Sequence, residues 1–534
     1  MSDDNKKKLD EQLIRCVLDD KLSNDKKLRK MDYIIRLGAD VNARYENGFS
    51  VLVLAKTIGN DEVVSFLEER GASCIGCDKE KVEEFFRTAS VDEINKVLKV
   101  LPDGYDLDCN VDLSGRGLTE LPDFSKLSVK GSFYCSGNQL DSLKGAPEYV
   151  GGNFSCFNNQ LTTLEGGPSE VYGNFWCSNN QLTSLKGGPV EVGGDYDCSD
   201  NKLDSLEDGP NKVGGSYNCS NNQLTTLKGA PVEVSGDYNC SNNKLDSLED
   251  GPNKVGGDYN CSNNELDSLK GAPVEVGGNY NCSNNKLTSL KDGPVVVGKS
   301  FDREKNIVSL YDEDGWPTKI GGSYDCSNNL LISLDGAPRE IYGSFSCFGN
   351  KLTSLKGAPN RIDEVFDCSN NELTTLKGAP SKVLNFYCFG NKLTSLKGGP
   401  VEVWGSYDCS NNELDSLNGA PSKVRNFDCF ANKLTTLEEG PSGVYGKFWC
   451  FNNQLTSLKG GPVEVGGDYN CSDNQLTSLI GAPVEVGGNF NCKNNPLKSS
   501  RGRPRYIRGS FLRDNIREYN IRDVALNILN HFRR

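Results

Sequence analysis

The stretch Val192–Pro210 reads V-G-G-D-Y-D-C-S-D-N-K-L-D-S-L-E-D-G-P, and variants of it recur along most of the chain. Lines of 21 residues place the cysteines from Cys156 to Cys282 in one unbroken column. The column extends upstream to Cys135 and downstream to Cys492, and it holds 17 of the 21 cysteines. Of the 21 prolines, 18 fall at the loop position that ends the unit. The chain is therefore a repeat array.

Each unit combines a fixed apolar pattern with one polar position. In the quoted unit, Tyr196, Cys198 and Leu203 take apolar positions, and Asn201 takes the polar one. Periods of 20–29 residues with the pattern L-x-L-x-x-N-x-L are typical of leucine-rich repeats. The inward Asn is predicted to hydrogen-bond backbone groups of its own and the neighbouring coil. The column cysteines are predicted to be reduced, buried core residues, because a free thiol packs as a small apolar group.

We predict a leucine-rich repeat solenoid over residues 107–500, with one short parallel strand per coil of roughly 20–23 residues and about 19 coils. This count includes two irregular units, which begin at Leu113 (L-S-G-R-G-L) and at Arg303 (R-E-K-N-I-V). Coils such as Asn180–Pro189, N-Q-L-T-S-L-K-G-G-P, resemble the short, proline-bearing leucine-rich repeats of bacterial effector proteins, lengthened by one residue. The resemblance implies the solenoid fold.

Residues 1–106 are predicted to form a helical, ankyrin-like module. Gly38–Ala43 (G-A-D-V-N-A) and Gly71–Ser73 (G-A-S) begin 33 residues apart, which is the ankyrin period. Ser50–Ala55 (S-V-L-V-L-A) stands where ankyrin units have T-P-L-H-x-A, without the His. Residues 9–36 and 78–100 are predicted helical flanks, and whether they are true ankyrin units stays open. The combination resembles repeat proteins of large amoeba-infecting DNA viruses and of protists.

Residues 501–534 differ in composition from the coils. They hold nine Arg against three acidic residues, although the whole chain carries a net charge of −14. Six apolar residues fall on one helical face: Ile521, Val524, Ala525, Ile528, Leu529 and Phe532. The segment is predicted to form a basic cap with an amphipathic helix that covers the end of the solenoid. Contact of this Arg-rich tail with a partner or with nucleic acid is the alternative.

Most enzyme classes are disfavoured. His531 is the only histidine, which weakens triad, His-based metal and His general-base chemistry. Some effectors with similar repeats carry a ubiquitin-ligase domain after the coils. The 34 residues that follow the coils here contain no cysteine, so that activity is not expected. We predict a non-catalytic protein, with a ligase-like effector as an alternative.

Two short motifs are expected to be coincidental. Gly293–Ser300 matches the phosphate-loop pattern G-x-x-x-x-G-K-S, but its register predicts extended backbone and Pro294 removes an amide. Nucleotide binding at 293–300 stays an alternative. Cys74 and Cys77 form a lone C-x-x-C without a second pair, so no metal site is predicted. No cofactor and no small-molecule substrate are expected.

The chain is expected to be intracellular and cytoplasmic, in a host cytoplasm if the protein is viral or an effector. Its N-terminus, MSDDNKKKLDEQLIRC, has no apolar core of a signal peptide. No run approaches the roughly 18 apolar residues that a membrane helix needs. Membrane contact is therefore not expected, and the negative charge disfavours nucleic acid.

The outward side of the predicted strands is the candidate binding surface. Strand alternation sends Asp195, Asp197 and Ser199 outward, and the consensus there is Asn, Asp and Ser. Large aromatic residues on such a polar face are typical anchors for a partner. Nine outward positions hold an aromatic residue instead of the consensus Asn, Asp or Ser: Tyr134, Phe157, Trp176, Phe348, Tyr387, Phe389, Phe430, Trp449 and Phe451. We predict a protein-binding scaffold that uses this concave face and the ankyrin-like module; stacking of the rings on one another is the alternative.

Overall fold

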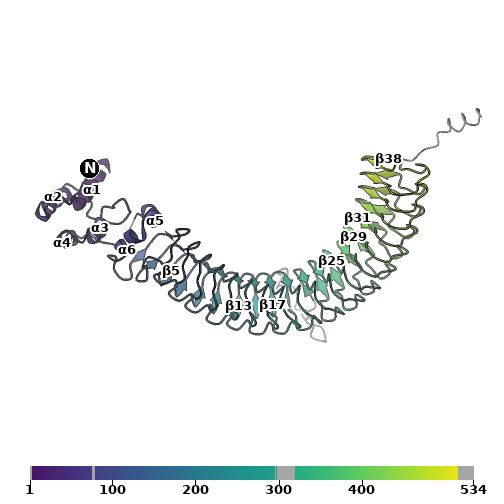
Figure 1. The fold of residues 1–534 in the computed structure, drawn as a ribbon, viewed down its shortest axis with the longest axis horizontal. Coiled ribbons are helices and arrows are strands. Elements are labelled where there is room, and N and C mark those ends of the chain that lie inside the picture. The colour runs from purple at the N-terminus through teal and green to yellow at the C-terminus, as the bar shows by residue number, and fades with distance from the viewer. Residues whose placement is uncertain (1–2, 75–77, 295, 298–318, 515–534) are drawn as a thin grey trace, which may run out of the picture. The chain divides into compact units, whose positions relative to one another are not determined.

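The structure, a computed structural model, describes residues 3–74, 78–294, 296–297 and 319–514 (Figure 1). The chain divides into two compact units, Met1–Gly257 and Asp258–Arg534. The first unit begins with helices and continues into coils. The described residues of the second unit form coils.

Among the described residues, six helices precede the coils. They are α1 (Asp3–Leu18), α2 (Asn24–Arg36), α3 (Val51–Ile58), α4 (Asp61–Glu69), α5 (Lys79–Thr88) and α6 (Val91–Leu98). Helix α1 packs against α2, and α3 packs against α4. Ser50 begins α3 by accepting a hydrogen bond from the Val53 N–H, and Ser90 with Glu93 forms a capping box on α6. The predicted helical segment is present, and its identity as ankyrin units stays a prediction.

Two parallel ladders of short strands run through the coils of the first unit. The first ladder consists of β2 (Val111–Asp112), β4 (Phe133–Tyr134), β6 (Phe154–Ser155), β8 (Phe175–Trp176), β10 (Tyr196–Asp197), β12 (Tyr217–Asn218) and β14 (Tyr238–Asn239). The second ladder consists of β1 (Asp106–Leu107), β3 (Ser128–Val129), β5 (Tyr149–Val150), β7 (Glu170–Val171), β9 (Glu191–Val192), β11 (Lys212–Val213), β13 (Glu233–Val234) and β15 (Lys254–Val255). The predicted parallel strand in each coil is confirmed, and the second strand is an additional finding.

The second unit repeats both ladders. Its first ladder consists of β16 (Tyr259–Asn260), β18 (Tyr280–Asn281), β21 (Tyr324–Asp325), β23 (Phe345–Ser346), β25 (Val365–Asp367), β27 (Asn385–Tyr387), β29 (Ser406–Asp408), β31 (Asn426–Asp428), β33 (Phe448–Trp449), β35 (Tyr469–Asn470), β37 (Phe490–Asn491) and β39 (Phe511–Leu512). The second-ladder strands are β17 (Glu275–Val276), β19 (Val296–Val297), β20 (Lys319–Ile320), β22 (Glu340–Ile341), β24 (Arg361–Ile362), β26 (Lys382–Val383), β28 (Glu402–Val403), β30 (Lys423–Val424), β32 (Gly443–Val444), β34 (Glu464–Val465), β36 (Glu485–Val486) and β38 (Tyr506–Ile507). Strands β38 and β39 pair with β36 and β37, so the coils continue past residue 500. The predicted capping helix at residues 521–532 lies outside the described residues.

The first ladder continues across the irregular unit predicted at Arg303. Strand β18 pairs directly with β21, with Tyr280 opposite Tyr324. The Leu287 N–H donates to Asn329 Oδ1 at 3.1 Å, although 42 residues separate the two. Residues 298–318 lie outside the described residues. Their sequence has no Cys at the core position. The solenoid therefore has about 18 coils.

Aromatic rings and thiols fill the interior of the coils. In the first unit, the ring centroids of Phe175 and Tyr196 are 5.4 Å apart, and those of Tyr196 and Tyr217 are 5.2 Å apart. All 17 column cysteines are thiols, and each is 0% exposed. Burial raises the pKa of thiols such as Cys198 well above its ordinary value, so they stay protonated. The prediction of a buried thiol column is confirmed.

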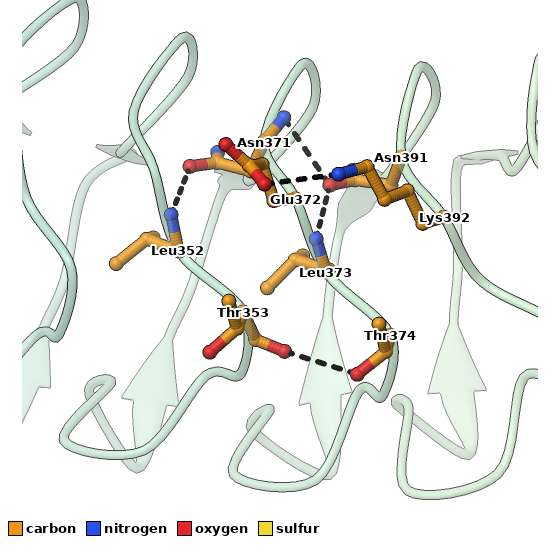
Figure 2. Close-up of polar contacts among 8 residues, drawn as sticks. All are labelled: Leu352, Thr353, Asn371, Glu372, Leu373, Thr374, Asn391 and Lys392. Atoms are coloured by element: carbon orange, nitrogen blue, oxygen red, sulfur yellow. Dashed lines mark hydrogen bonds and ion pairs between the residues drawn. The ribbon is translucent and has the colours of Figure 1, made fainter.

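The buried Asn of each coil joins that coil to its neighbour (Figure 2). Asn391 Oδ1 accepts hydrogen bonds from the Leu373 N–H at 3.0 Å and the Asn371 N–H at 3.2 Å. Its Nδ2 donates to the carbonyl oxygens of Cys368 and Cys388, both at 3.1 Å. One amide thus satisfies backbone groups of two coils, which confirms the predicted role of the Asn column.

The residue before each buried Asn has a left-handed backbone. Asn411 there has φ 52°, and Gly390 has φ 66°. In the described coils this position is Asn, Asp or Gly except at Ala431, which has φ 53°. A left-handed backbone costs roughly 1–2 kcal/mol for an ordinary L-residue, whereas Gly and Asn tolerate it. Ala431 is therefore a strained position in the second unit.

Ala431→Asn is expected to stabilise the protein by about 0.5–1 kcal/mol, because Asn tolerates the left-handed backbone. Thermal unfolding followed by circular dichroism should show a rise in Tm of about 1–3 °C. Ala431→Val is the matched opposite change, because a β-branched residue is disfavoured at positive φ, and it should lower Tm. Equal Tm values for all three proteins would contradict the assignment of strain.

Candidate protein-interaction surface

Three positions of each coil lie on the outer side of the first ladder. In the quoted repeat they are Asp195, Asp197 and Ser199. We call the positions equivalent to Asp197 in all coils the central column, and those equivalent to Ser199 the serine column. Asp195 and Asp197 are half-buried, but Ser199 is only 5% exposed. Ser199 is buried although its position faces outward, because its N–H and hydroxyl both donate to Asp197 Oδ1, at 3.0 and 2.6 Å. The serine thus closes the strand end.

The predicted aromatic residues of the first unit lie on this side. Tyr134 and Trp176 belong to the central column, and the strand register places buried Ser155 between them. Phe157 belongs to the serine column and is 42% exposed, whereas Tyr134 and Trp176 are half-buried. The structure therefore brings the three residues onto one face of three consecutive coils.

The six predicted aromatic residues of the second unit lie on the corresponding face. Tyr387 and Trp449 stand in the central column. The remaining four replace the serine of their coils: Phe348, Phe389, Phe430 and Phe451. All six are half-buried, so each keeps part of its ring in contact with solvent.

Three of these rings contact one another. Phe430 and Phe451 are stacked, with centroids 4.4 Å apart and planes within 7° of parallel. Trp449 meets Phe451 edge to face at 6.4 Å. Lys447 Nζ lies 4.8 Å from the Trp449 ring centroid. We call Phe430, Trp449 and Phe451 the aromatic cluster. We predicted either rings exposed to a partner or rings stacked on one another, and the three rings of the aromatic cluster show both stacking and partial exposure.

Carboxylates adjoin the aromatic cluster in the central column. Tyr387 is opposite Asp408, Asp408 is opposite Asp428, and Asp428 is opposite Trp449. Asp408 Oδ1 accepts a hydrogen bond from the Ser410 N–H at 2.9 Å, as in the regular coils. Burial nevertheless raises the pKa of Asp408 above its ordinary value.

Asp428 lacks the serine that supports Asp408. The residue two positions later is Phe430, and within the described part of the chain Asp428 Oδ1 is buried without a hydrogen-bond partner. Burial and, to a smaller extent, the Asp408 carboxylate raise the pKa of Asp428 to about 7, although Lys447 acts to lower it. The face therefore holds a poorly solvated carboxylate, Asp428, beside the half-buried rings of the aromatic cluster.

Several strongly exposed aromatic residues lie beside the second ladder and were not predicted. Tyr172 in the first unit is 63% exposed, and Trp404 and Tyr445 in the second unit are 62% and 66% exposed. Each replaces the glycine that follows the Val strand in the quoted repeat, Gly193. This replacement was the available signal. It was missed because one strand per coil was expected, and only its outward side was considered.

The other motifs show no site in the described residues. Val296 and Val297 form β19, in the extended backbone expected for the phosphate-loop match, and residues 298–300 lie outside the description. Among the described residues, no group of three or more His, Cys, Asp or Glu could hold a metal ion. Cys77 of the C-x-x-C pair also lies outside them. None of the described helices combines the length and apolar character needed to cross a membrane.

No protein-family model and no curated protein matches the chain. Among solved structures, YopM from Yersinia enterocolitica is similar with a TM-score of 0.50 and 19% sequence identity, over 87% of this chain and 98% of that chain. YopM from Yersinia pestis, described as a leucine-rich effector protein, gives a TM-score of 0.39 and 18% identity, over 84% of this chain and 96% of that chain. The first likeness supports the leucine-rich repeat fold. The resemblance to viral and protist proteins stays a prediction.

Proposed function

We propose that this protein is a non-catalytic scaffold that binds another protein on the first-ladder face of its second unit. The aromatic cluster carries this proposal. Elsewhere the outer positions are mainly Asp, Asn and Ser, which are polar and gain little from being covered by a partner. Large half-exposed rings on a regular, rigid ladder are the usual anchors of an interface.

The rings of the aromatic cluster offer a large area to a partner and are already held in place. An aromatic residue buries roughly 150–250 Å² when it is fully covered. Trp449 and Phe451 already pack on one another at 6.4 Å, so a partner would order few additional rotamers on binding. The N-terminal group of Tyr134, Phe157 and Trp176 and the helices of the first unit are secondary candidates for partner contacts.

The proposed compartment is the cytoplasm of a cell or of an infected host. Twenty described cysteines are buried thiols, and a chain with so many thiols suits a reducing environment. Burial raises the pKa of thiols such as Cys198 and makes them poor nucleophiles, which also supports a non-catalytic role.

Replacing Trp449 and Phe451 by Ala should cost at least about 2 kcal/mol of affinity for a partner captured from native cells. Affinity would be measured by calorimetry with the purified partner. Thermal stability should stay nearly unchanged, because both rings lie outside the core. Unfolding of neighbouring coils would instead identify the rings as packing residues and remove the support for the proposal.

Trp404→Ala is the matched control, because it removes an exposed Trp of the same unit from beside the other ladder. We expect this variant to bind the partner within about twofold of the wild type. A large loss with Trp404→Ala and none with the double variant would place the partner beside the second ladder.

A further inference from the structure

The central column of the second unit places acidic and aromatic side chains in one line. By strand register, Asp367, Tyr387, Asp408, Asp428 and Trp449 follow one another on five successive coils. Neighbouring parallel strands lie about 4.8 Å apart, so each side chain is close to the next. We call these five residues the acidic–aromatic column.

Positive charge is scarce on this face. Among the described outer positions of these five coils, Lys447 is the only cationic residue, against three Asp. Lys447 Nζ lies over the Trp449 ring at 4.8 Å, so the ring already accepts a cation on one face. Asp428 remains under-solvated despite this cation, because Phe430 replaces the serine that would donate to it. The excess of carboxylates and the Asp428 oxygen left unpartnered among the described residues favour a cation from a partner, which would compete with Lys447 for the ring.

We propose that the acidic–aromatic column binds an arginine side chain from a basic, extended segment of a partner protein. Its guanidinium donates to the carboxylates of Asp408 and Asp428 and packs against the Trp449 ring. The inference rests on the proposed function and gives the chemistry of the partner at that same surface.

Arginine fits this surface better than lysine does. A guanidinium is planar, weakly hydrated and able to donate to two carboxylates at once while it stacks on an aromatic ring. An ammonium is a compact, strongly hydrated charge that loses more on leaving water. A nucleic acid is disfavoured, because three carboxylates in one column repel phosphate. The complementary partner is therefore an arginine-bearing peptide.

The test uses the full chain and a blocked peptide, acetyl-Gly-Ser-Arg-Gly-Arg-Ser-Gly-amide, with affinity measured by calorimetry at pH 8. The double variant Asp408→Asn/Asp428→Asn should weaken binding at least tenfold. Its thermal stability should not fall, because the change removes charges that burial disfavours. The control Asp237→Asn/Asp258→Asn removes the same charge from polar coils of the first ladder and should change affinity less than twofold. Equal losses in both double variants would reduce the effect to diffuse attraction and overturn the proposal.

Two altered peptides separate charge from shape. Citrulline in place of arginine keeps the shape and removes the charge, and it should weaken binding at least tenfold. Lysine in place of arginine should weaken binding about fivefold or more. Lysine binding equal to arginine binding would overturn the guanidinium assignment.

Lys447→Gln tests the role of the ring. The substitution frees the Trp449 face and removes a competing cation, so the affinity for the arginine peptide should rise about threefold. An unchanged or lower affinity would mean that Lys447 does not compete with the peptide for the Trp449 ring, and it would overturn the stacking geometry.

The chain's own basic end is the alternative occupant. If replacing Arg517, Arg522, Arg533 and Arg534 by Gln raises peptide affinity more than tenfold, this end occupies the column and the partner proposal fails. A captured partner distinguishes the scaffold function from arginine binding. If its binding needs Trp449 and Phe451 but not Asp408 and Asp428, the scaffold function stands and the arginine proposal is overturned.

Discussion

Asn391→Ala is expected to lower the free energy of unfolding of the surrounding coils by at least about 4 kcal/mol. The amide accepts from the backbone N–H groups of Leu373 and Asn371 and donates to the carbonyl oxygens of Cys368 and Cys388. Ala can replace none of these bonds, and water has no access to the fully buried core beside them. Each buried backbone group left without a partner costs roughly 1–3 kcal/mol, so several together exceed the effect of an ordinary core substitution.

Lys392→Ala, one residue further along, is the matched control (Figure 2). Lys392 Nζ pairs with Glu372 at 2.9 Å, but both side chains are about half exposed, and such pairs contribute roughly 0.2–1 kcal/mol. Urea unfolding and hydrogen exchange of the Leu373 amide would measure both variants. Fast exchange confined to the Asn391 variant is the expected result. A loss below about 1 kcal/mol would show that the Asn column contributes little to stability.

The Asn and Cys columns could be predicted because a solenoid places equivalent residues of successive coils side by side. Aligning the repeats in sequence therefore aligns them in space, and Asn371 and Asn391 occupy the same environment. The same reasoning placed the candidate aromatic residues on one side of the ladder. Such equivalence is a property of repeat folds and does not extend to irregular segments, as the direct pairing of β18 with β21 shows.

The features that were missed depend on side-chain geometry within single coils. The second ladder was missed because its two-residue strands are too short for alternation within one coil to reveal them, and exposed Trp404 was visible only as a replacement of the glycine at that position. Burial of Ser199 follows from its bonds to Asp197, which the outward direction of the position did not reveal. The environment of Asp428 depends on one replacement, Phe430 for Ser, and on the stacking of Phe430 with the next coil.

That environment makes the stability of the second unit depend on pH. The pKa of Asp428 is about 7 in the folded protein, against an ordinary value of 3.8. A folded-state pKa above the unfolded value means that the folded state holds the proton more tightly. The stabilisation that the protonated Asp428 gives the folded protein is fully present below about pH 4, and it is lost as the pH rises to about 7. Asp428→Asn cannot ionise and should lack this loss.

Asp428→Asn is therefore expected to be more stable than the wild type by about 2–3 kcal/mol at pH 8 and to match it at pH 4. The full shift corresponds to about 4 kcal/mol, and partial exposure of the side chain to solvent reduces that figure. Asp408→Asn should give a smaller gain, because the Ser410 N–H already donates to the Asp408 carboxylate at 2.9 Å. Urea unfolding at several pH values between 4 and 8 would measure the free energy of unfolding of the three proteins.

A neighbouring charge also affects this pH dependence. Lys447→Gln should lose more stability at pH 8 than the wild type does, because Lys447 is the cation that lowers the pKa of Asp428. Parallel pH curves for the wild type and Asp428→Asn would show that Asp428 is solvated and would remove one reason for a cation to bind beside it.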